Sequence, residues 1–148
     1  MARKTTKSKA KDKIKGRETN KPANPASGSK PVWIFSEIDR SGKFAFDIQR
    51  VGNDSITILD KIINYSTMTW QTIKQQTHDN GKSKHHYLNY SGLSEEARQR
   101  LVAKKLEDRV DDLFSFALEN KLRIVGYTEQ EKFYVLWYDP QHEVYPVK

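Results

Sequence analysis

Residues 122–139 read LRIVGYTEQEKFYVLWYD, and this stretch decides the fold. Aliphatic residues dominate 122–125, and 133–138 form a nearly continuous apolar run. Two short apolar runs separated by a polar segment, here 128–130, are typical of a β-hairpin. Because a continuous run indicates burial on both faces, we predict a central strand over 133–138. Gly126 within the first strand indicates a close backbone approach.

An earlier part of the chain also carries a strand pattern. Alternate residues of 44–48 are Phe, Phe and Ile, which is the period of a half-buried strand. The turn-like sequence Asp-Arg-Ser-Gly at 39–42 precedes them. We therefore predict an N-terminal hairpin of about 32–39 with 43–50.

The segments between and after these strands complete the predicted fold. Pro140 ends the last long strand because it cannot donate to a strand ladder, and 144–145 are predicted to add a short edge strand. Apolar residues at helical spacing predict helices in the middle of the chain. These helices are expected over 55–65, 69–74, 95–104 and 107–119. The fold class is therefore α+β: an antiparallel sheet from the N-terminal hairpin and the C-terminal strands, packed with about four helices.

The first thirty residues differ in charge from the rest of the chain. Residues 1–30 hold ten Lys or Arg against Asp12 and Glu18, whereas 31–148 hold 16 Lys or Arg and 17 Asp or Glu. With Ile14 as its one strong aliphatic residue, the first segment cannot bury enough apolar surface to offset the entropy of ordering. We expect a disordered basic tail over 1–30 and one α+β domain over 31–148. The tail either contacts an RNA or DNA phosphate backbone or only aids solubility; its candidate contacts are Lys4, Lys7, Lys9, Lys11, Lys13 and Lys15.

Length and composition exclude several classes of protein. A chain of 148 residues with 36% hydrophobic residues is too short for a large multidomain enzyme. It has no cysteine, which excludes disulfides, zinc ribbons, iron–sulfur clusters and thiol nucleophiles. No stretch approaches the roughly 20 apolar residues of a membrane span, and no apolar segment of a secretory signal follows the N-terminal charges. We expect a cytoplasmic protein with no membrane partner.

Two motifs fail on spacing. Gly81-Lys82-Ser83 resembles a phosphate-binding loop, but the glycine that such a loop needs five residues earlier is Gln76. The histidines and Asp139 offer metal-ligand chemistry, but no pair has the HxxxH or HExxH spacing, so a surface-loop role is favoured. We predict no cofactor and no metal. The residues considered for a metal were His78, His85, His86, His142 and Asp139.

The polar loop at 74–86 is the most cationic part of the body. It carries three lysines and three histidines against one acid, Asp79. Such a loop either holds a nucleic-acid phosphate backbone or is a solvated connection. Its candidate binding residues are Lys82, Lys84, His85 and His86.

Several side chains that can bind phosphate or transfer a proton lie close together in the sequence near the C-terminus. A hairpin brings the strand of Arg123 beside the last long strand, and His142 and Tyr145 follow that strand. RNA cleavage without metal needs one group to accept the 2′-hydroxyl proton, one to protonate the leaving oxygen, and a cation to stabilise the phosphorane. Histidine serves either proton step near neutral pH. These three residues are the catalytic candidates, against the alternative of structural or surface roles.

From about residue 94 to the end, two helices, an Arg-Ile-Val-Gly strand, a turn, an apolar strand, a histidine and a tyrosine follow one another. This order resembles the RelE/HigB/ParE superfamily of small bacterial toxins, in which two helices pack on an antiparallel sheet. The end of the chain is also similar to uncharacterised bacterial proteins, some from mobile elements, with an Arg-Ile…Leu-Trp-Tyr-Asp-Pro-x-His pattern. The resemblance implies that Arg123, His142 and Tyr145 hold the catalytic or phosphate-binding positions of an mRNA interferase. It implies mRNA on the ribosome and an antitoxin as partners.

Two hypotheses follow, and whether the protein is an enzyme stays open between them. The first is a toxin-like, nucleic-acid-associated protein that cleaves RNA without metal. The second is a non-enzymatic phage or defence-system protein whose body binds a protein partner and whose basic tail contacts nucleic acid. The acids of the C-terminal hairpin favour the second, because an interferase normally presents a positive face to RNA. These acids are Glu129, Glu131, Asp139 and Glu143.

Overall fold

The computed structural model describes residues 28–146, and a five-stranded sheet forms its centre. The strand order is β1-β5-β4-β3-β2. β1 runs parallel to β5, and the other pairs are antiparallel. The α+β class is therefore confirmed, with a mixed sheet in place of a purely antiparallel one. The strands are β1 (Val32–Ile34), β2 (His86–Tyr87), β3 (Leu113–Glu119), β4 (Leu122–Glu129) and β5 (Lys132–Asp139).

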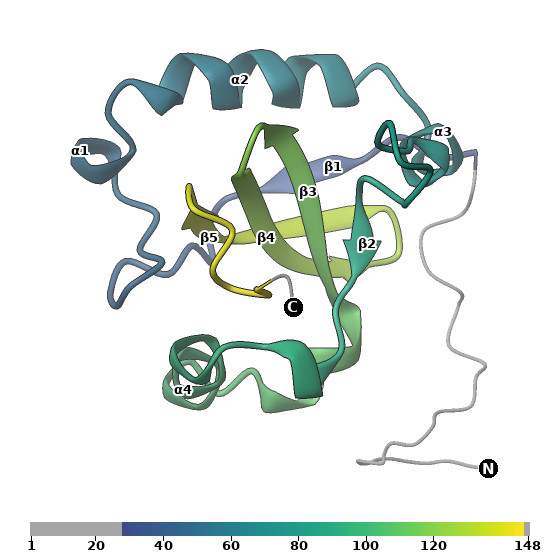
Figure 1. Cartoon of the computed structure of the whole chain (residues 1–148). Coiled ribbons are helices and arrows are strands. Elements are labelled where there is room, and N and C mark those ends of the chain that lie inside the picture. Colours follow the sequence, from purple (N-terminus) through teal and green to yellow (C-terminus); the bar gives the residue numbers. More distant parts are fainter. Residues whose placement is uncertain (1–27, 147–148) are drawn as a thin grey trace, which may run out of the picture.

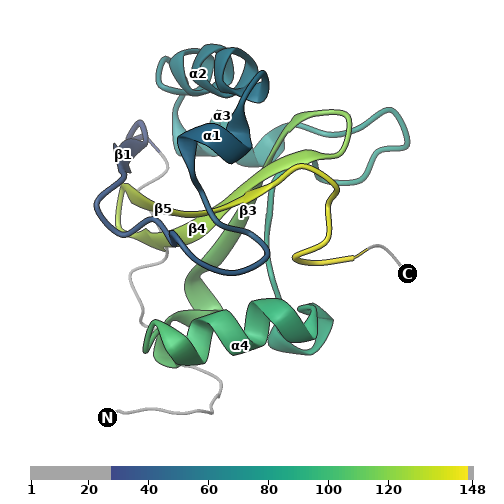
Figure 2. The same cartoon turned by 90° about the vertical axis from the view of Figure 1, so that its left-hand side faces the viewer.

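Helices cover both faces of this sheet, so the described chain has three layers (Figure 1). α2 lies over one face and α4 over the other, and the view from the side shows the sheet between them (Figure 2). Three of the predicted helices, near 55–65, 69–74 and 95–104, are confirmed. The α-helices are α1 (Ile48–Val51), α2 (Asp54–Tyr65), α3 (Trp70–Gln75) and α4 (Glu95–Ala103), and two 3-10 turns are η1 (Tyr90–Gly92) and η2 (Glu107–Asp112).

Two apolar cores hold the layers together, because successive side chains of a strand point to opposite faces. On the α2 side the core contains Ile58, Trp70, Phe114, Phe116, Leu122, Ile124, Phe133 and Val135. On the α4 side it contains Leu88, Leu93, Leu101, Leu113, Val125, Leu136, Trp137 and Val144.

The predicted N-terminal hairpin is wrong. Only Val32–Ile34 form a strand, and they pair with β5 and not with 43–50. The second half of the predicted hairpin ends in a helix, because the Asp47 side chain accepts a hydrogen bond from Gln49 N (3.2 Å) and caps α1. Phe44 does not belong to a strand. Tyr138 N of β5 donates a single backbone hydrogen bond to Phe44 O (3.0 Å), and the Phe44 side chain is buried.

The predicted helix over 107–119 is also wrong. Its first part is the 3-10 turn η2, and its second part is the strand β3. Every residue from Leu113 to Leu118 is buried, so the apolar residues that match helical spacing belong to a strand covered on both faces. The predicted edge strand at 144–145 is absent from the described sheet, since Val144 N instead donates to the Asp139 side chain (2.9 Å).

The C-terminal hairpin is confirmed as β4 and β5. β5 has neighbours on both sides, as its continuous apolar sequence predicts, although β4 is the middle strand. Gly126 lies at a register shift between the two strands, and a Cβ built there would lie 2.0 Å from Tyr134 O. The close backbone approach predicted at Gly126 is therefore confirmed. No helix within 28–146 has the length and apolar character that crossing a bilayer requires.

Candidate functional site at the end of the sheet

Three segments of the chain meet on one side of the molecule: the β3–β4 turn, the residues after β5 and the loop before β2 (Figure 2). The turn carries Lys121 and leads directly into Arg123 of β4. In the sheet register Arg123 lies opposite Asp139, the last residue of β5. The hairpin therefore places Arg123 beside the end of β5, from which the segment of His142 and Tyr145 continues.

Arg123 is a largely buried cation. Its side chain folds back toward the turn, where Nη1 donates to Asn120 O (2.7 Å) and to Leu122 O (3.1 Å). Burial lowers the pKa of Arg123, and the charges of Asp139 and Tyr65 oppose this shift. Since only 9% of Arg123 is exposed, it acts on its surroundings mainly through its electric field.

Asp139 organises the segment that follows β5. Its carboxylate is buried and accepts hydrogen bonds from Glu143 N (2.8 Å) and Val144 N (2.9 Å). Burial raises the pKa of Asp139, and the two backbone hydrogen bonds partly offset that rise. This carboxylate therefore holds the backbone of the two residues that follow His142, which limits where the imidazole can lie.

His142 sits at the tip of this pinned segment with a left-handed backbone (φ 60°) and a half-buried side chain. Burial lowers the pKa of His142, and the charges of Arg123, His86, His78 and Lys121 lower it further. The imidazole is consequently neutral at pH 7 and able to accept a proton. The same interactions mean that Arg123, His142 and two histidines of the 74–86 loop share one electrostatic environment.

Tyr145 joins this group through His86. The two rings have centroids 5.8 Å apart, and the Tyr145 hydroxyl accepts a hydrogen bond from Asn89 N (3.4 Å). The Tyr145 ring also lies against Gly92, where a Cβ would come within 2.5 Å of it. His86 thus contacts Tyr145 and also contributes to the lowered pKa of His142, which links the two C-terminal candidates.

The residues of the 74–86 loop separate into exposed and buried ones. Lys82 is exposed, and Lys84 and His86 are half-buried. His85 is buried, with Nδ1 accepting from Ala117 N (3.0 Å) and Nε2 2.8 Å from Gln76 Oε1. Both ring nitrogens of His85 are occupied within the protein, so it is a structural residue of the loop. The six tail lysines proposed to bind nucleic acid lie outside the described residues.

The four acids of the C-terminal hairpin do not all lie at the same end of the sheet. Glu129 and Glu131 lie at the β4–β5 turn, the opposite end of the hairpin from the Arg123 and Asp139 pair. Glu143 lies 3.6 Å from Lys43 Nζ, so a cation partly neutralises it. With Asp139 buried, this end of the sheet carries Arg123, Lys121 and the imidazoles together with the carboxylates of Glu119 and Asp54.

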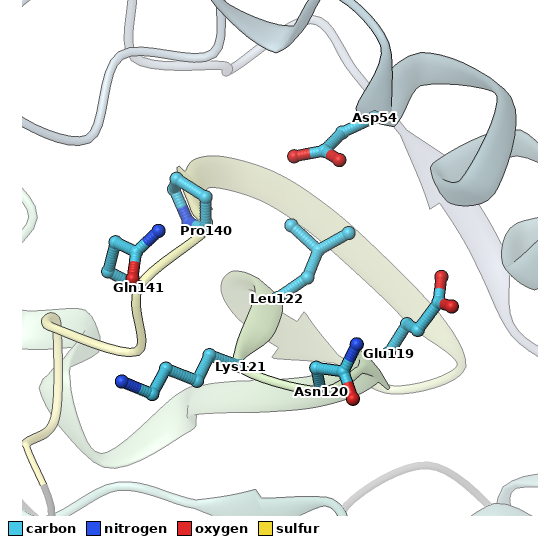
Figure 3. Close-up of a pocket in the computed structure, with 7 residues that line it drawn as sticks. All are labelled: Asp54, Glu119, Asn120, Lys121, Leu122, Pro140 and Gln141. Carbon is cyan, nitrogen blue, oxygen red and sulfur yellow. The ribbon is translucent and has the colours of Figure 1, made fainter.

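A hollow of about 510 Å³ borders this group on the α2 side. It lies between the first residue of α2, the β3–β4 turn and the residues just after β5 (Figure 3). Sequence reasoning missed it, because Asp54 joins the other residues only through tertiary packing. Its lining is Asp54, Glu119, Asn120, Lys121, Leu122, Pro140 and Gln141.

Within residues 28–146, no group of three or more His, Cys, Asp or Glu side chains has the arrangement of a metal site. Comparison with known proteins gave no match: neither a family model, nor a curated protein, nor a solved structure matches this chain.

Proposed function

We propose that the protein is a toxin-like, nucleic-acid-associated protein that binds an RNA phosphate at the end of the sheet and cleaves the chain without metal. The observation that carries the proposal is that Arg123 pairs with Asp139 at the end of the sheet and that Asp139 holds the segment of His142 by its bonds to Glu143 N and Val144 N. The charges of Arg123 and His86 act on the pKa of His142 in the same place. Such a group of cations and imidazoles attracts a phosphodiester and supplies proton transfer next to it. The part of the resemblance to the RelE/HigB/ParE superfamily that supports the same function is the C-terminal hairpin with Arg123, His142 and Tyr145, since the second of the two expected helices is the turn η2 and the strand β3.

In the proposed reaction His142 accepts the 2′-hydroxyl proton, since its lowered pKa keeps the imidazole neutral at pH 7. The 2′-oxygen then attacks phosphorus, and the bond from phosphorus to the 5′-oxygen breaks. Tyr145 donates a proton to the departing 5′-oxygen. The field of Arg123 and the exposed Lys82 and Lys121 stabilise the negative charge of the phosphorane.

Substitution of His142 tests this function. We expect His142→Ala to abolish growth inhibition on expression and the cutting of translated mRNA, with unchanged far-UV circular dichroism. Lys104→Ala, on the α4 side of the molecule, is the matched control and should keep both activities. Full activity of His142→Ala in a gel assay would rule out the proposed site.

A second candidate function is a protein-interaction module, and the surface of α2 favours it. Ile56, Leu59 and Ile63 are 72%, 59% and 56% exposed although they are large aliphatic residues. Their spacing of three and four residues is that of a helix–helix seam, which fits an amphipathic helix of a partner such as an antitoxin. If this is the whole function, removing the tail abolishes nucleic-acid binding and no variant cleaves RNA. If the body is a nuclease, cleavage persists without the tail.

A further inference from the structure

The hollow beside His142 has a polar lining that is divided by charge. Figure 3 shows Lys121 and Gln141 on one side of Leu122 and Glu119 on the other, with Asp54 above it. One side therefore offers hydrogen-bond donors, the ammonium of Lys121 and the amide of Gln141. The other side offers the carboxylate oxygens of Glu119.

The apolar part of the lining is made by Leu122 and Pro140. Leu122 lies in the middle of the hollow, and the ring of Pro140 stands beside it (Figure 3). A planar ligand that rests on these two residues reaches the donors with one edge and the carboxylate with the other. Pockets that bind small ligands commonly combine an apolar floor with a few placed polar groups in this way.

Part of the wall of the hollow is held in place by hydrogen bonds. Asp54 Oδ2 accepts from the Tyr138 hydroxyl (2.6 Å), which fixes that carboxylate relative to β5. Arg123 Nη1 holds the carbonyl oxygens of Asn120 and Leu122, which fixes the β3–β4 turn. These bonds fix Asp54 and the backbone of the β3–β4 turn, whereas Glu119, Lys121 and Gln141 are exposed side chains whose ordering is part of the cost of binding a ligand.

The hollow lies next to the chain segments that carry His142 and Arg123, although neither side chain lines it. Lys121 lines it and also contributes to the lowered pKa of His142, so the ammonium lies within electrostatic reach of that imidazole. Gln141 precedes His142 in the chain, and Leu122 precedes Arg123. The cation that a phosphate of a nucleotide in the hollow would meet is Lys121, which lines the hollow on the side of Gln141 (Figure 3).

We propose that this hollow is a base-recognition pocket for guanine, an inference that rests on the proposed RNA-directed function. Guanine presents two adjacent donors, N1–H and the N2 amino group, which match a bidentate carboxylate such as Glu119. Its O6 and N7 are acceptors on the adjoining major-groove edge, where O6 lies beside N1–H, and Lys121 and Gln141 are the donors that the hollow offers to them.

The other bases fit the divided lining less well. Adenine places its amino donor between two ring acceptors, so it cannot satisfy both oxygens of one carboxylate. Uracil has one N–H between two carbonyl acceptors, and cytosine has acceptors next to its amino group. A second acceptor on the same edge would face Glu119 and be repelled by it. The pocket therefore selects guanine by the pairing of donors and acceptors.

The test measures binding of the four nucleoside 3′-monophosphates to the full chain by isothermal titration calorimetry. We expect guanosine 3′-monophosphate to bind at least tenfold more tightly than the other three. Because all four carry the same phosphate, contacts of the basic tail cancel in this comparison. Glu119→Gln should remove the preference, since an amide offers only one acceptor. Glu129→Gln, at the far end of the hairpin, is the matched control and should keep it.

The outcomes separate the pocket from the proposed reaction. Equal binding of the four nucleotides, or a guanine preference unchanged in Glu119→Gln, overturns the pocket assignment. If the protein cleaves RNA without preference for guanine, the reaction stands and the pocket fails. His142→Ala should lose cleavage but keep the guanine preference, which supports a separate base site. A guanine preference in a wild-type chain that cuts no RNA supports the pocket and overturns the reaction.

Discussion

The Nδ1 atom of His85 accepts a hydrogen bond from the backbone N–H of Ala117 over 3.0 Å, in a place where β3 extends past its partner β2. The bond requires Nδ1 to be unprotonated, so the ring proton is on Nε2 and points at Gln76 Oε1 (2.8 Å). If Nδ1 were protonated, its N–H and the N–H of Ala117 would face each other, and neither could accept a hydrogen bond. Burial lowers the pKa of His85 from 6.5 to about 3, and the charge of Lys84 adds to this.

We therefore predict that the protein loses stability as the pH falls below 6.5. The unfolded chain binds a proton at His85 in this range and the folded chain does not, so unfolding is favoured by about 1.4 kcal/mol per pH unit from this residue. Urea unfolding at pH 7 and pH 5 measures the slope. His85→Asn keeps an acceptor for Ala117 but cannot titrate, so its stability should depend less on pH. An equal slope in the two proteins would contradict this role of His85.

Arg100 joins α4 to the loop that carries Asp39. Its Nε and Nη2 donate to the two oxygens of Asp39 (2.9 and 2.8 Å), and Trp137 Nε1 also donates to Oδ2 (2.9 Å). Burial by itself would raise the pKa of Asp39, but the hydrogen bonds from Arg100 and Trp137 outweigh it, so the pKa is lowered. We predict that Arg100→Ala, which leaves this carboxylate buried without its ion-pair partner, costs about 3 kcal/mol in the free energy of unfolding. The exposed neighbour substitution Gln99→Ala should change it by less than about 0.5 kcal/mol.

Gly126 has no room for a side chain. A Cβ at this position would lie 2.0 Å from Tyr134 O and 2.9 Å from Phe133 Cζ, and the contact with backbone cannot be relieved by a rotamer change. We predict that Gly126→Ala destabilises the protein by about 3 kcal/mol or prevents folding. Gly28→Ala, where nothing lies within 4 Å of the new Cβ, is the control. Thermal unfolding of both variants checks this, and two equal midpoints would contradict it.

The rate of RNA cleavage should depend on pH through His142. Because the pKa of His142 is lowered, the neutral imidazole persists below pH 6.5. We predict that the cleavage rate rises with pH in the acidic range and levels off before pH 6.5. Lys121→Ala removes one of the charges that lower this pKa, so the rise should move to higher pH. A rise centred above pH 6.5, or a rise that does not move in Lys121→Ala, would contradict His142 as the proton acceptor.

The six tail lysines at 4, 7, 9, 11, 13 and 15 should add a salt-sensitive contribution to nucleic-acid binding. Replacing all six by glutamine is expected to reduce the dependence of log K on log salt concentration by up to about 4 for single-stranded RNA. Fluorescence anisotropy at several salt concentrations measures this slope. An unchanged slope would mean that the tail contributes no phosphate contacts.

The local sequence was sufficient to predict those helices and strands whose pattern of apolar and polar residues fits only one kind of secondary structure. The β4–β5 hairpin follows from two apolar runs around a polar turn, and α4 follows from Ser94, whose side chain accepts from Ala97 N (3.2 Å). The grouping of Arg123 with the residues after β5 follows from the same hairpin, since antiparallel pairing sets its first residues beside the end of the next strand.

Only tertiary structure decided the rest. The run at 113–118 matches helical spacing and strand burial equally, and the partners on both sides of β3 select the strand. Likewise β1 pairs with β5 across about a hundred residues, a choice that no local pattern encodes. Asp54 meets Glu119 and Gln141 at one hollow only because α2 packs over the end of the sheet. Side-chain periodicity and helix capping act between neighbours in the chain, whereas strand pairing and layer packing depend on which strand edges and apolar faces the whole fold leaves uncovered.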